Sequence, residues 1–493
     1  MSDAPKGQQW KTLDTDLHRI SRVEQAATYA ARPMVGFGIA LAFIVLAALS
    51  AGIFLGYSSS NYVVIAAAAF GAYMAVNIGA NDVANNMGPA VGAKALSMGG
   101  AILIAAICES AGALLAGGDV VSTISKGIID PNSVADSQVF IWAMMAALIS
   151  SALWVNLATW VGAPVSTTHS VVGGVLGAGI AAAGLTAVNW SSMSMIAASW
   201  VISPVLGGVV AAGFLALIKA KILYQEDKIA ASRRWVPILI GVMAGVFATY
   251  LALKGLKKIV HIDMGMALFI GLVLGLISYA VSRPAIFRAS EGLENRNKSV
   301  KVLFGLPLVF SAGLLSFAHG ANDVANAVGP LAAIVHASEF GGFEAKVSIP
   351  TWVMVIGAFG ISFGLFLFGP KLIRMVGSQI TKLNPMRAYC VALSAAITVI
   401  VASWLGLPVS STHIAVGGVF GVGFYREWHM ERRLRKPDAT VGNVKRIAVE
   451  ERRRRKLVRR SHFMTIIAAW VITVPAAATM SALIFVLLTS IVT

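Results

Sequence analysis

The feature that most constrains this chain is a series of about thirteen apolar runs, each long enough or nearly long enough to cross a lipid bilayer. A transmembrane helix needs roughly 20 apolar residues. Only 12% of the chain is charged, about half of the ~25% usual in soluble domains. We therefore expect an all-α polytopic membrane protein with about 12–13 hydrophobic segments. The runs are Met34–Gly56, Tyr62–Gly79, Ala101–Gly117, Phe140–Trp160, Val165–Ala183, Ile196–Ile218, Pro237–Leu253, Met264–Val281, Val302–Ala318, Trp352–Phe368, Tyr389–Leu405, Val409–Phe424 and Phe463–Val492.

Lys and Arg concentrate in a few polar connections between these runs. The connections are residues 1–33, Lys219–Arg234, Arg283–Lys301, Lys371–Arg387 and Arg426–Arg460. If the N-terminus is inside and each run crosses once, every basic connection falls on the cytoplasmic side, as the positive-inside rule requires. The net charge of +17 then reflects basic cytoplasmic loops that set the orientation of the protein in the membrane, and it does not indicate a nucleic-acid partner. We expect a multi-pass protein of a bacterial inner membrane with a cytoplasmic N-terminus. The stretch Arg452–Lys456 is either an anionic-lipid contact or part of a solvated loop.

A seven-residue motif, Gly-Ala-Asn-Asp-Val-Ala-Asn, occurs at Gly79–Asn85 and again, unchanged, at Gly320–Asn326. Asp and Asn are expensive to bury in such apolar surroundings. Their carboxylate and amide oxygens suit Na⁺, and an Asp can instead carry a proton. The alternative is a polar clasp between helices. The candidate ligands are Asn81, Asp82, Asn85, Asn322, Asp323 and Asn326, with a Na⁺ site expected near Asn81, Asp82, Asn322 and Asp323.

A second motif, Pro-Val-Ser-(Thr/Ser)-Thr-His, follows each copy of the first. Pro164 and Pro408 break the preceding helix, so Ser and Thr hydroxyls stand at the start of the next one. A helix N-terminus with free N–H groups and hydroxyl donors is a ready oxyanion site. The alternative is an ordinary Ser or Thr cap after a proline kink. The candidate anion ligands are Ser166, Thr167, Thr168, Ser410, Ser411 and Thr412.

The two motifs recur in the same order, which divides the chain into two related halves. The first copy of the Gly-Ala-Asn-Asp-Val-Ala-Asn motif (the leading motif) ends a run that crosses from outside to inside. The second copy ends a run that crosses from inside to outside, so the halves have opposite topology. Inverted repeats with broken helices are typical of secondary transporters. The glycine-rich runs Val165–Ala183 and Val409–Phe424 are either spans or re-entrant hairpins. The expected domains are a cytoplasmic segment 1–33, an extra transmembrane helix 34–60, a first repeat 61–218, connecting helices and loops 219–301, and a second repeat 302–493 with a basic cytoplasmic loop 426–460.

Glu109 is the remaining carboxylate deep in an apolar run, which favours a role in ion coupling. His169 and His413 are either titrating groups or caps that bond backbone. His319 has no counterpart in the first motif copy, where Ile78 stands, and no role is assigned to it. The sequence has no P-loop, nucleophile elbow or metal-binding His/Cys cluster, so we expect neither an enzyme nor a cofactor.

The paired motifs resemble those of the PiT family of inorganic phosphate transporters, over roughly Tyr62–Val492. The resemblance implies a phosphate permease that imports inorganic phosphate by symport with Na⁺ or H⁺. It implies that the Asn and Asp residues of the first motif bind the cation and phosphate, and that Ser166–Thr168 and Ser410–Thr412 contact phosphate. Glu109 stands where relatives also carry a glutamate. Sodium-coupled relatives often have a glutamate where this chain has Ala392, which leaves the coupling ion open.

Other functions remain open at this point. A permease of the same fold for sulfate or another oxyanion would use the same hydroxyl and N–H donors. An anion channel would use the same helix N-termini, but paired carboxylates poised to take a cation argue for coupling. The expected partners are inorganic phosphate, membrane lipid and, as an option, a second copy in a homodimer.

Overall fold

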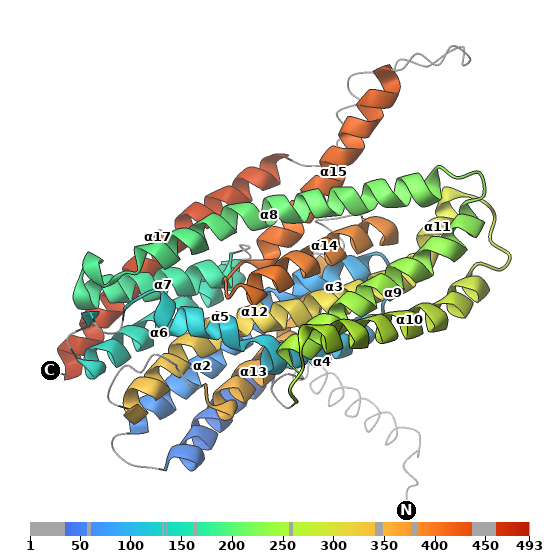
Figure 1. Ribbon diagram of the computed structural model, residues 1–493. Helices are drawn as coiled ribbons and strands as arrows, with labels where there is room; N and C mark the ends of the chain where they lie inside the picture. The colour runs from blue at the N-terminus through green and yellow to red at the C-terminus, as the bar shows by residue number, and fades with distance from the viewer. Residues whose placement is uncertain are drawn as a thin grey trace, which may run out of the picture.

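The computed structural model describes residues 35–56, 61–130, 133–134, 136–161, 165–255, 260–340, 349–375, 383–435 and 460–492. In these residues the chain is helical apart from its connections and one isolated bridge between Ile129 and Val188. Figure 1 shows the helices packed side by side in one bundle. The main helices are Val35–Leu55, α2 (Tyr62–Asn81), α3 (Val83–Gly92), α4 (Met98–Ala116), α5 (Gly118–Ser122), α6 (Ser137–Val161), α7 (Thr167–Ala183), α8 (Trp190–Ile218), α9 (Lys228–Lys254), α10 (Met264–Ala289), α11 (Asn297–Leu303), α12 (Gly305–Phe340), α13 (Thr351–Met375), α14 (Pro385–Trp404), α15 (Ser411–Arg435) and α17 (Arg460–Val492).

Ten helices of the described part are long and apolar enough to cross a membrane, or eleven if the bent pair α11–α12 counts as one span. Each apolar run of the sequence coincides with one helix or, for Val302–Ala318, with the bent pair α11–α12, so the expected all-α polytopic fold is confirmed. Helix α7 is too short to cross, because its 17 residues rise about 26 Å against a hydrocarbon core of ~30 Å. The segments 1–33, Gly162–Pro164 and Arg452–Lys456 lie outside the described residues.

Helices α6 and α7 form a re-entrant hairpin. The amide of Asp130, before α6, donates to the carbonyl of Ala187, after α7, at 2.9 Å. The amide of Asn189 donates to the carbonyl of Ile128, also at 2.9 Å. The chain therefore enters α6 and leaves α7 at the same end of the molecule.

Helices α14 and α15 form a second re-entrant hairpin. Arg387, in the first turn of α14, lies close enough to Arg426 of α15 for their charges to interact. Both lie at the end where α8 finishes, since Lys219 stacks over the ring of Tyr425 at 4.7 Å. Of the two alternatives open from sequence, the hairpin is correct for both glycine-rich segments. Each hairpin replaces two crossings, so the expected sidedness of the basic loops is unchanged.

The first copy of the Gly-Ala-Asn-Asp motif spans the junction of α2 and α3, and the second lies inside α12, so helix continues past both expected ends, Gly79 and Ala318. The backbone bends at Asp82, but its amide still donates to the carbonyl of Ile78 at 2.9 Å, and α3 continues to Gly92. Helix α12 continues without a break to Phe340. Hydropathy falls at the Asn and Asp residues of the motif, whereas the backbone hydrogen bonds of the helix continue. The runs predicted from hydropathy therefore ended before the helices do.

The two halves pack reciprocally. Helix α2 contacts α13 while α4 contacts α12, and α7 contacts α17 while α8 contacts α15. Equivalent residues meet at the centre: the hydroxyls of Ser110 and Ser362 lie 2.8 Å apart. The rings of His169 and His413 are 4.8 Å apart, centroid to centroid. Reciprocal contacts of this kind are expected of two halves related by a two-fold axis. The exact domain boundaries remain a prediction.

Two motif glycines allow the helices of opposite halves to touch. A Cβ on Gly79 would stand 1.9 Å from the carbonyl oxygen of Ile361 on α13. A Cβ on Gly320 would stand 2.1 Å from the carbonyl oxygen of Glu109 on α4. Small residues give this close backbone approach between helices in a membrane. The glycine that begins each motif copy therefore sets the distance between the halves.

We expect Gly320→Ala to destabilise the protein. The added methyl collides with backbone that cannot rotate away, and overpacking of this kind costs about 1–3 kcal/mol. Thermal unfolding in detergent should show a lower midpoint for Gly320→Ala. Gly213→Ala is the matched control, since nothing lies within 4 Å of a Cβ there. Equal midpoints for the two variants would contradict the close contact.

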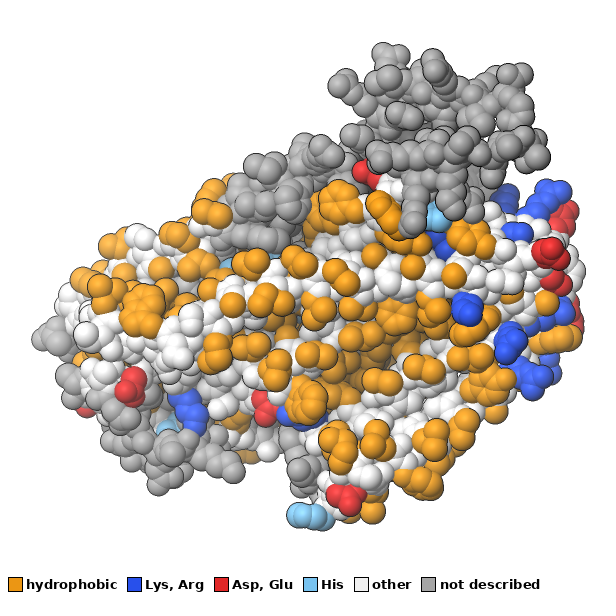
Figure 2. All heavy atoms as spheres, turned by 45° about the horizontal axis from the view of Figure 1, so that its top comes forward, with side chains coloured by type: hydrophobic (Ala, Val, Ile, Leu, Met, Phe, Trp, Pro, Cys, Tyr) orange, Lys and Arg blue, Asp and Glu red, His pale blue; other side chains and the backbone are white. Residues whose placement is uncertain are grey.

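Lys and Arg side chains gather at the end of the molecule where α11 lies (Figure 2). Two of the basic loops meet there, because the side-chain amide of Asn295 donates to the carbonyl of Glu226 at 2.7 Å. Arg233 also donates to the hydroxyl of Ser290 at 2.6 Å. Apolar side chains cover the middle of the face that Figure 2 shows. One end therefore has the charge pattern expected of a cytoplasmic side.

Candidate functional site

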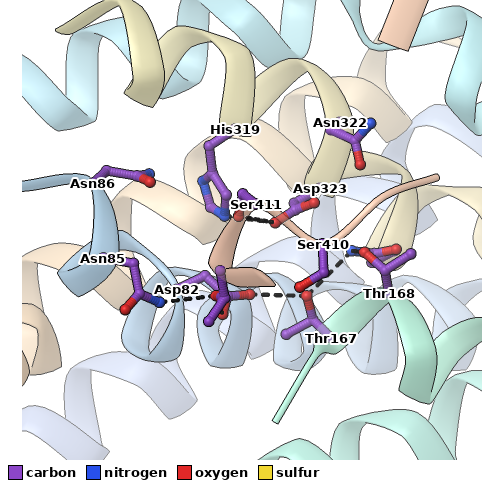
Figure 3. A network of polar contacts seen from close by, with 12 residues as sticks. Asp82, Asn85, Asn86, Thr167, Thr168, His319, Asn322, Asp323, Ser410 and Ser411 are labelled. Carbon is purple, nitrogen blue, oxygen red and sulfur yellow. Dashed lines mark hydrogen bonds and ion pairs between the residues drawn. The ribbon is translucent and has the colours of Figure 1, made fainter. Parts of the chain in front are cut away.

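Asp82 lies at the bend between α2 and α3 and is almost completely buried. Its carboxylate accepts a hydrogen bond from the hydroxyl of Thr167 at 2.8 Å. It accepts a second from the hydroxyl of Thr412 at 3.3 Å. Thr167 begins α7 and Thr412 lies in the first turn of α15, so both re-entrant hairpins converge on this one carboxylate (Figure 3).

Asp323 lies on the unbroken helix α12, with His319 one turn before it. The Nε2 of His319 is 2.7 Å from a carboxylate oxygen of Asp323. Its Nδ1 is 3.1 Å from Oε1 of Glu109 on α4. The side-chain amide of Asn86 donates to the same Oε1 at 3.1 Å. All four side chains are buried, so α3, α4 and α12 are joined by a continuous polar chain.

The carboxylates of the two halves are close together. One ligand atom from each of Asp82, His319 and Asp323 can be chosen so that all lie within 4.8 Å of one another. Ser411 of α15 donates to Asp323 at 3.3 Å. The structure thus places the duplicated Asp residues side by side, and their role as cation ligands stays a prediction.

Some buried oxygen acceptors at this centre have no hydrogen-bond donor among the described residues. Three buried oxygens lack a hydrogen-bond partner among the described residues: Oδ1 of Asp323, Oε2 of Glu109 and Oδ1 of Asn326. Leaving such an atom unpaired costs about 1–3 kcal/mol. A bound Na⁺ or an added proton would relieve that cost, because either one can be held by an unpaired oxygen. The residues present therefore fit a small hard cation.

The N-termini of α7 and α15 face the same centre. The hydroxyl of Ser166 caps α7 by accepting from the amide of His169 at 3.2 Å, and that of Ser410 accepts from the amide of His413 at 3.4 Å. These two serines act as N-caps, which was the structural alternative for them. Thr167 and Thr412 instead turn to Asp82. The helix ends keep the positive field that favours an anion.

The motif asparagines serve two purposes. Asn326 donates to the hydroxyls of Thr167 and Thr168, at 3.3 and 3.1 Å, and Asn85 donates to that of Thr412 at 2.8 Å. These two contact the hairpin tips beside the carboxylates. The other two motif asparagines, Asn81 and Asn322, do not contact the tips, since each bonds the helix that leads into a hairpin.

Asn81 donates to the hydroxyl of Thr159 on α6 at 2.7 Å, and Asn322 donates to that of Ser403 on α14 at 3.0 Å. Asn322 also accepts from the amide of Val409 at 3.2 Å. Both amides thereby hold a hairpin in place. Of the four residues expected to hold a cation, the structure places Asp82 and Asp323 at the centre and directs Asn81 and Asn322 to the hairpins.

Sequence reasoning missed Asn86 and gave His319 no role. A signal was present, because both break the repeat. Asn86 matches Ala327, and His319 matches Ile78, at the offset of the leading motif. The structure adds a third case: Gly79 packs on Ile361 where Gly320 packs on Glu109, so these two residues are equivalent. One of the two equivalent contacts between the halves thus has a polar Asn–Glu–His group where the other has apolar side chains.

Fold and site together define a multi-span helical membrane protein built around a buried, duplicated polar centre. Residues 78–481 match the model of the phosphate transporter family. The chain is 46% identical to a Helicobacter pylori protein named "Putative phosphate permease", over 96% of this chain and 98% of that protein. It is 35% identical to the Arabidopsis thaliana protein named "Inorganic phosphate transporter 2-1, chloroplastic", over 84% of this chain and 70% of that one.

A solved structure described as "The sodium-dependent phosphate transporter" superposes with a TM-score of 0.78 at 34% identity, covering 87% of this chain and 99% of that one. The chain therefore belongs to the phosphate transporter family. Its relatives are permeases and transporters, and it is not an enzyme.

Proposed function

We propose that this protein imports inorganic phosphate by symport with a cation, either Na⁺ or H⁺. The observation that carries the proposal is the set of unpaired buried oxygens on Asp323, Glu109 and Asn326, close to Asp82 and to the N-termini of two re-entrant helices. A cation entering this centre neutralises the carboxylates. Thr167 and Thr412 are then released from Asp82, and their hydroxyls and the helix ends become available to an anion.

This arrangement links the two ions through shared groups. Without a cation, the carboxylate of Asp82 occupies the hydroxyl donors and repels an incoming oxyanion. With a cation, both effects disappear. Coupling follows from this competition, because phosphate binds well only when the cation is present. No Lys or Arg of either motif holds the anion, so release needs only loss of the cation.

The test is uptake of radiolabelled phosphate into proteoliposomes under an imposed Na⁺ gradient and, separately, a pH gradient. Accumulation driven by one gradient identifies symport and its ion. Accumulation of sulfate but not phosphate would change the substrate within the same fold. Equilibration without accumulation under either gradient would indicate an anion channel and contradict coupling.

We expect Thr167→Val to weaken phosphate uptake about tenfold, mainly through a higher apparent KM. The hydroxyl contacts both Asp82 and Asn326, and loss of hydrogen bonds to a charged group costs roughly 1.5–3 kcal/mol. Thr479→Val is the control, since that hydroxyl bonds only the carbonyl of Pro475 in its own helix. Initial rates across a range of phosphate concentrations measure the effect, and an unchanged KM would remove Thr167 from the anion site.

The location we propose is a bacterial inner membrane with the basic end of Figure 2 facing the cytoplasm. The positive-inside rule supports this orientation. Cysteine substitutions at exposed Glu291 and exposed Val260, near opposite ends of α10, would report it by labelling with an impermeant maleimide in intact cells. Labelling at position 260 alone agrees with the orientation, and labelling at position 291 alone reverses it.

A further inference from the structure

An apolar cavity of about 850 Å³ lies between α4, α12 and the α9–α10 pair, and none of its lining residues belongs to the polar centre. Its walls come from all four helices and are made almost wholly of aliphatic and aromatic side chains. Ser278 is the one hydroxyl-bearing residue among those that line it. Such a cavity offers no site for a phosphate ion or for ordered water, because a buried water needs two to four polar partners.

The cavity is closed toward the protein and open toward the side. At its back, Phe317 is 3% exposed and Met243 is 8% exposed. At its rim, Ile107 is 60% and Phe310 is 49% exposed. In a protein that spans a bilayer, side chains exposed along the middle of the helices face hydrocarbon. The cavity therefore opens into the membrane.

The length and position of the cavity match one leaflet. Along α9 it extends from Met243 to Gly255, a rise of about 18 Å, close to half of the ~30 Å hydrocarbon core. Beside its outer end, Lys254 forms an ion pair with Asp119 of α5. Charged groups at a helix end mark the level of the membrane surface. The cavity thus runs from that surface toward the middle of the bilayer.

We propose that this cavity is a binding site for one acyl chain of a membrane phospholipid. An empty space of this size would leave its lining without dispersion contacts on one side. Acyl chains are the apolar molecules present at its opening, and they have the length and flexibility to follow it. A chain bound here fills the space between the α9–α10 pair and the helices that carry the polar centre.

The occupant would lie directly behind part of that centre. Cys108 lines the cavity, and the next residue along α4 is Glu109. Phe317 lines it from α12, two residues before His319. The lipid chain therefore supports the outer surfaces of the two helices that the Glu109–His319 contact joins.

The experiment uses the full chain in proteoliposomes that contain phosphatidylethanolamine with a photoactivatable diazirine on one acyl chain. After illumination, cross-linked residues are identified by peptide mass spectrometry. Cross-links should concentrate on cavity residues such as Phe247 and Phe317. In Ala248→Phe they should fall about tenfold, because the ring occupies the space and a bound chain would be overpacked. Val246→Phe, on the lipid-facing side of the same helix, should leave them unchanged.

Elution profile and thermal unfolding establish that both variants are folded. If Ala248→Phe does not fold, Gly313→Leu replaces it, since a Cβ at Gly313 meets its nearest neighbours at an ordinary 3.5 Å. Cross-links spread evenly over the exposed face of α10 would overturn the proposal. So would cavity cross-links that persist in a folded filled-cavity variant, or cavity residues cross-linked mainly to a second copy of the chain.

Discussion

Asp323→Asn should reduce concentrative phosphate uptake to about 1% of the wild-type rate. The carboxylate contacts His319 at 2.7 Å and Ser411 at 3.3 Å. A cation or proton held by the charged carboxylate loses about 3 kcal/mol of binding free energy when that charge is removed, the size of a strong interaction with a charged group, and this corresponds to about a hundredfold. The amide also cannot take a proton or balance the charge of a metal ion. Asp82→Asn should have the same effect, because Asp82 is the matching carboxylate of the other half.

The measurement is the initial rate and the plateau of uptake under whichever gradient drives the wild-type protein. Both variants should remain folded, since an amide fits the space of a carboxylate and still accepts the Thr167 and Ser411 hydroxyl bonds. Asp119→Asn is the control, because this carboxylate forms a partly exposed ion pair with Lys254, and such pairs contribute about 0–1 kcal/mol. Normal accumulation by both buried variants would remove these carboxylates from coupling.

The sequence predicted the fold class and singled out the polar residues of the centre because both depend on local patterns. Apolar runs of membrane length leave few alternatives to helices. A duplicated Asn-Asp motif in apolar surroundings is too costly to be incidental. The predicted location of Asp82 beside Asp323 depended only on the inverted relation of the halves, and the structure agrees with it.

The sequence could not show which residues meet across the halves. Whether Val165–Ala183 crossed or turned back depended on contacts such as Asp130 with Ala187, more than 50 residues apart. The partners of His319 depended on how closely Gly320 lets α12 approach α4. Hydropathy also ended the run before the motif, because it measures side chains and not the backbone hydrogen bonds that continue the helix. These are tertiary facts with no local signature.

The asymmetry between the halves leads to the second large prediction. His319→Ile, which copies Ile78 of the other half, should abolish phosphate uptake and also destabilise the protein by about 3–5 kcal/mol, as expected when one partner of a buried charged pair is removed. Glu109 and Asp323 would then be buried without the group that lies between them. His261→Ile, at an exposed loop position, is the control and should change neither quantity.

The double variant Glu109→Ile/His319→Ile separates support of the fold from transport. It reproduces the Ile361 and Ile78 pair at the equivalent contact between the halves, and replacing both partners of a buried polar contact by apolar groups is nearly neutral. Thermal unfolding should therefore recover in part, because Asn86 and Asp323 still each lose a partner, whereas phosphate uptake should stay at background. Recovery of both quantities would mean that the Glu109–His319 contact is only a polar clasp between α4 and α12. Recovery of stability alone assigns the contact to coupling, because the fold would then tolerate apolar side chains at both equivalent contacts whereas transport would not.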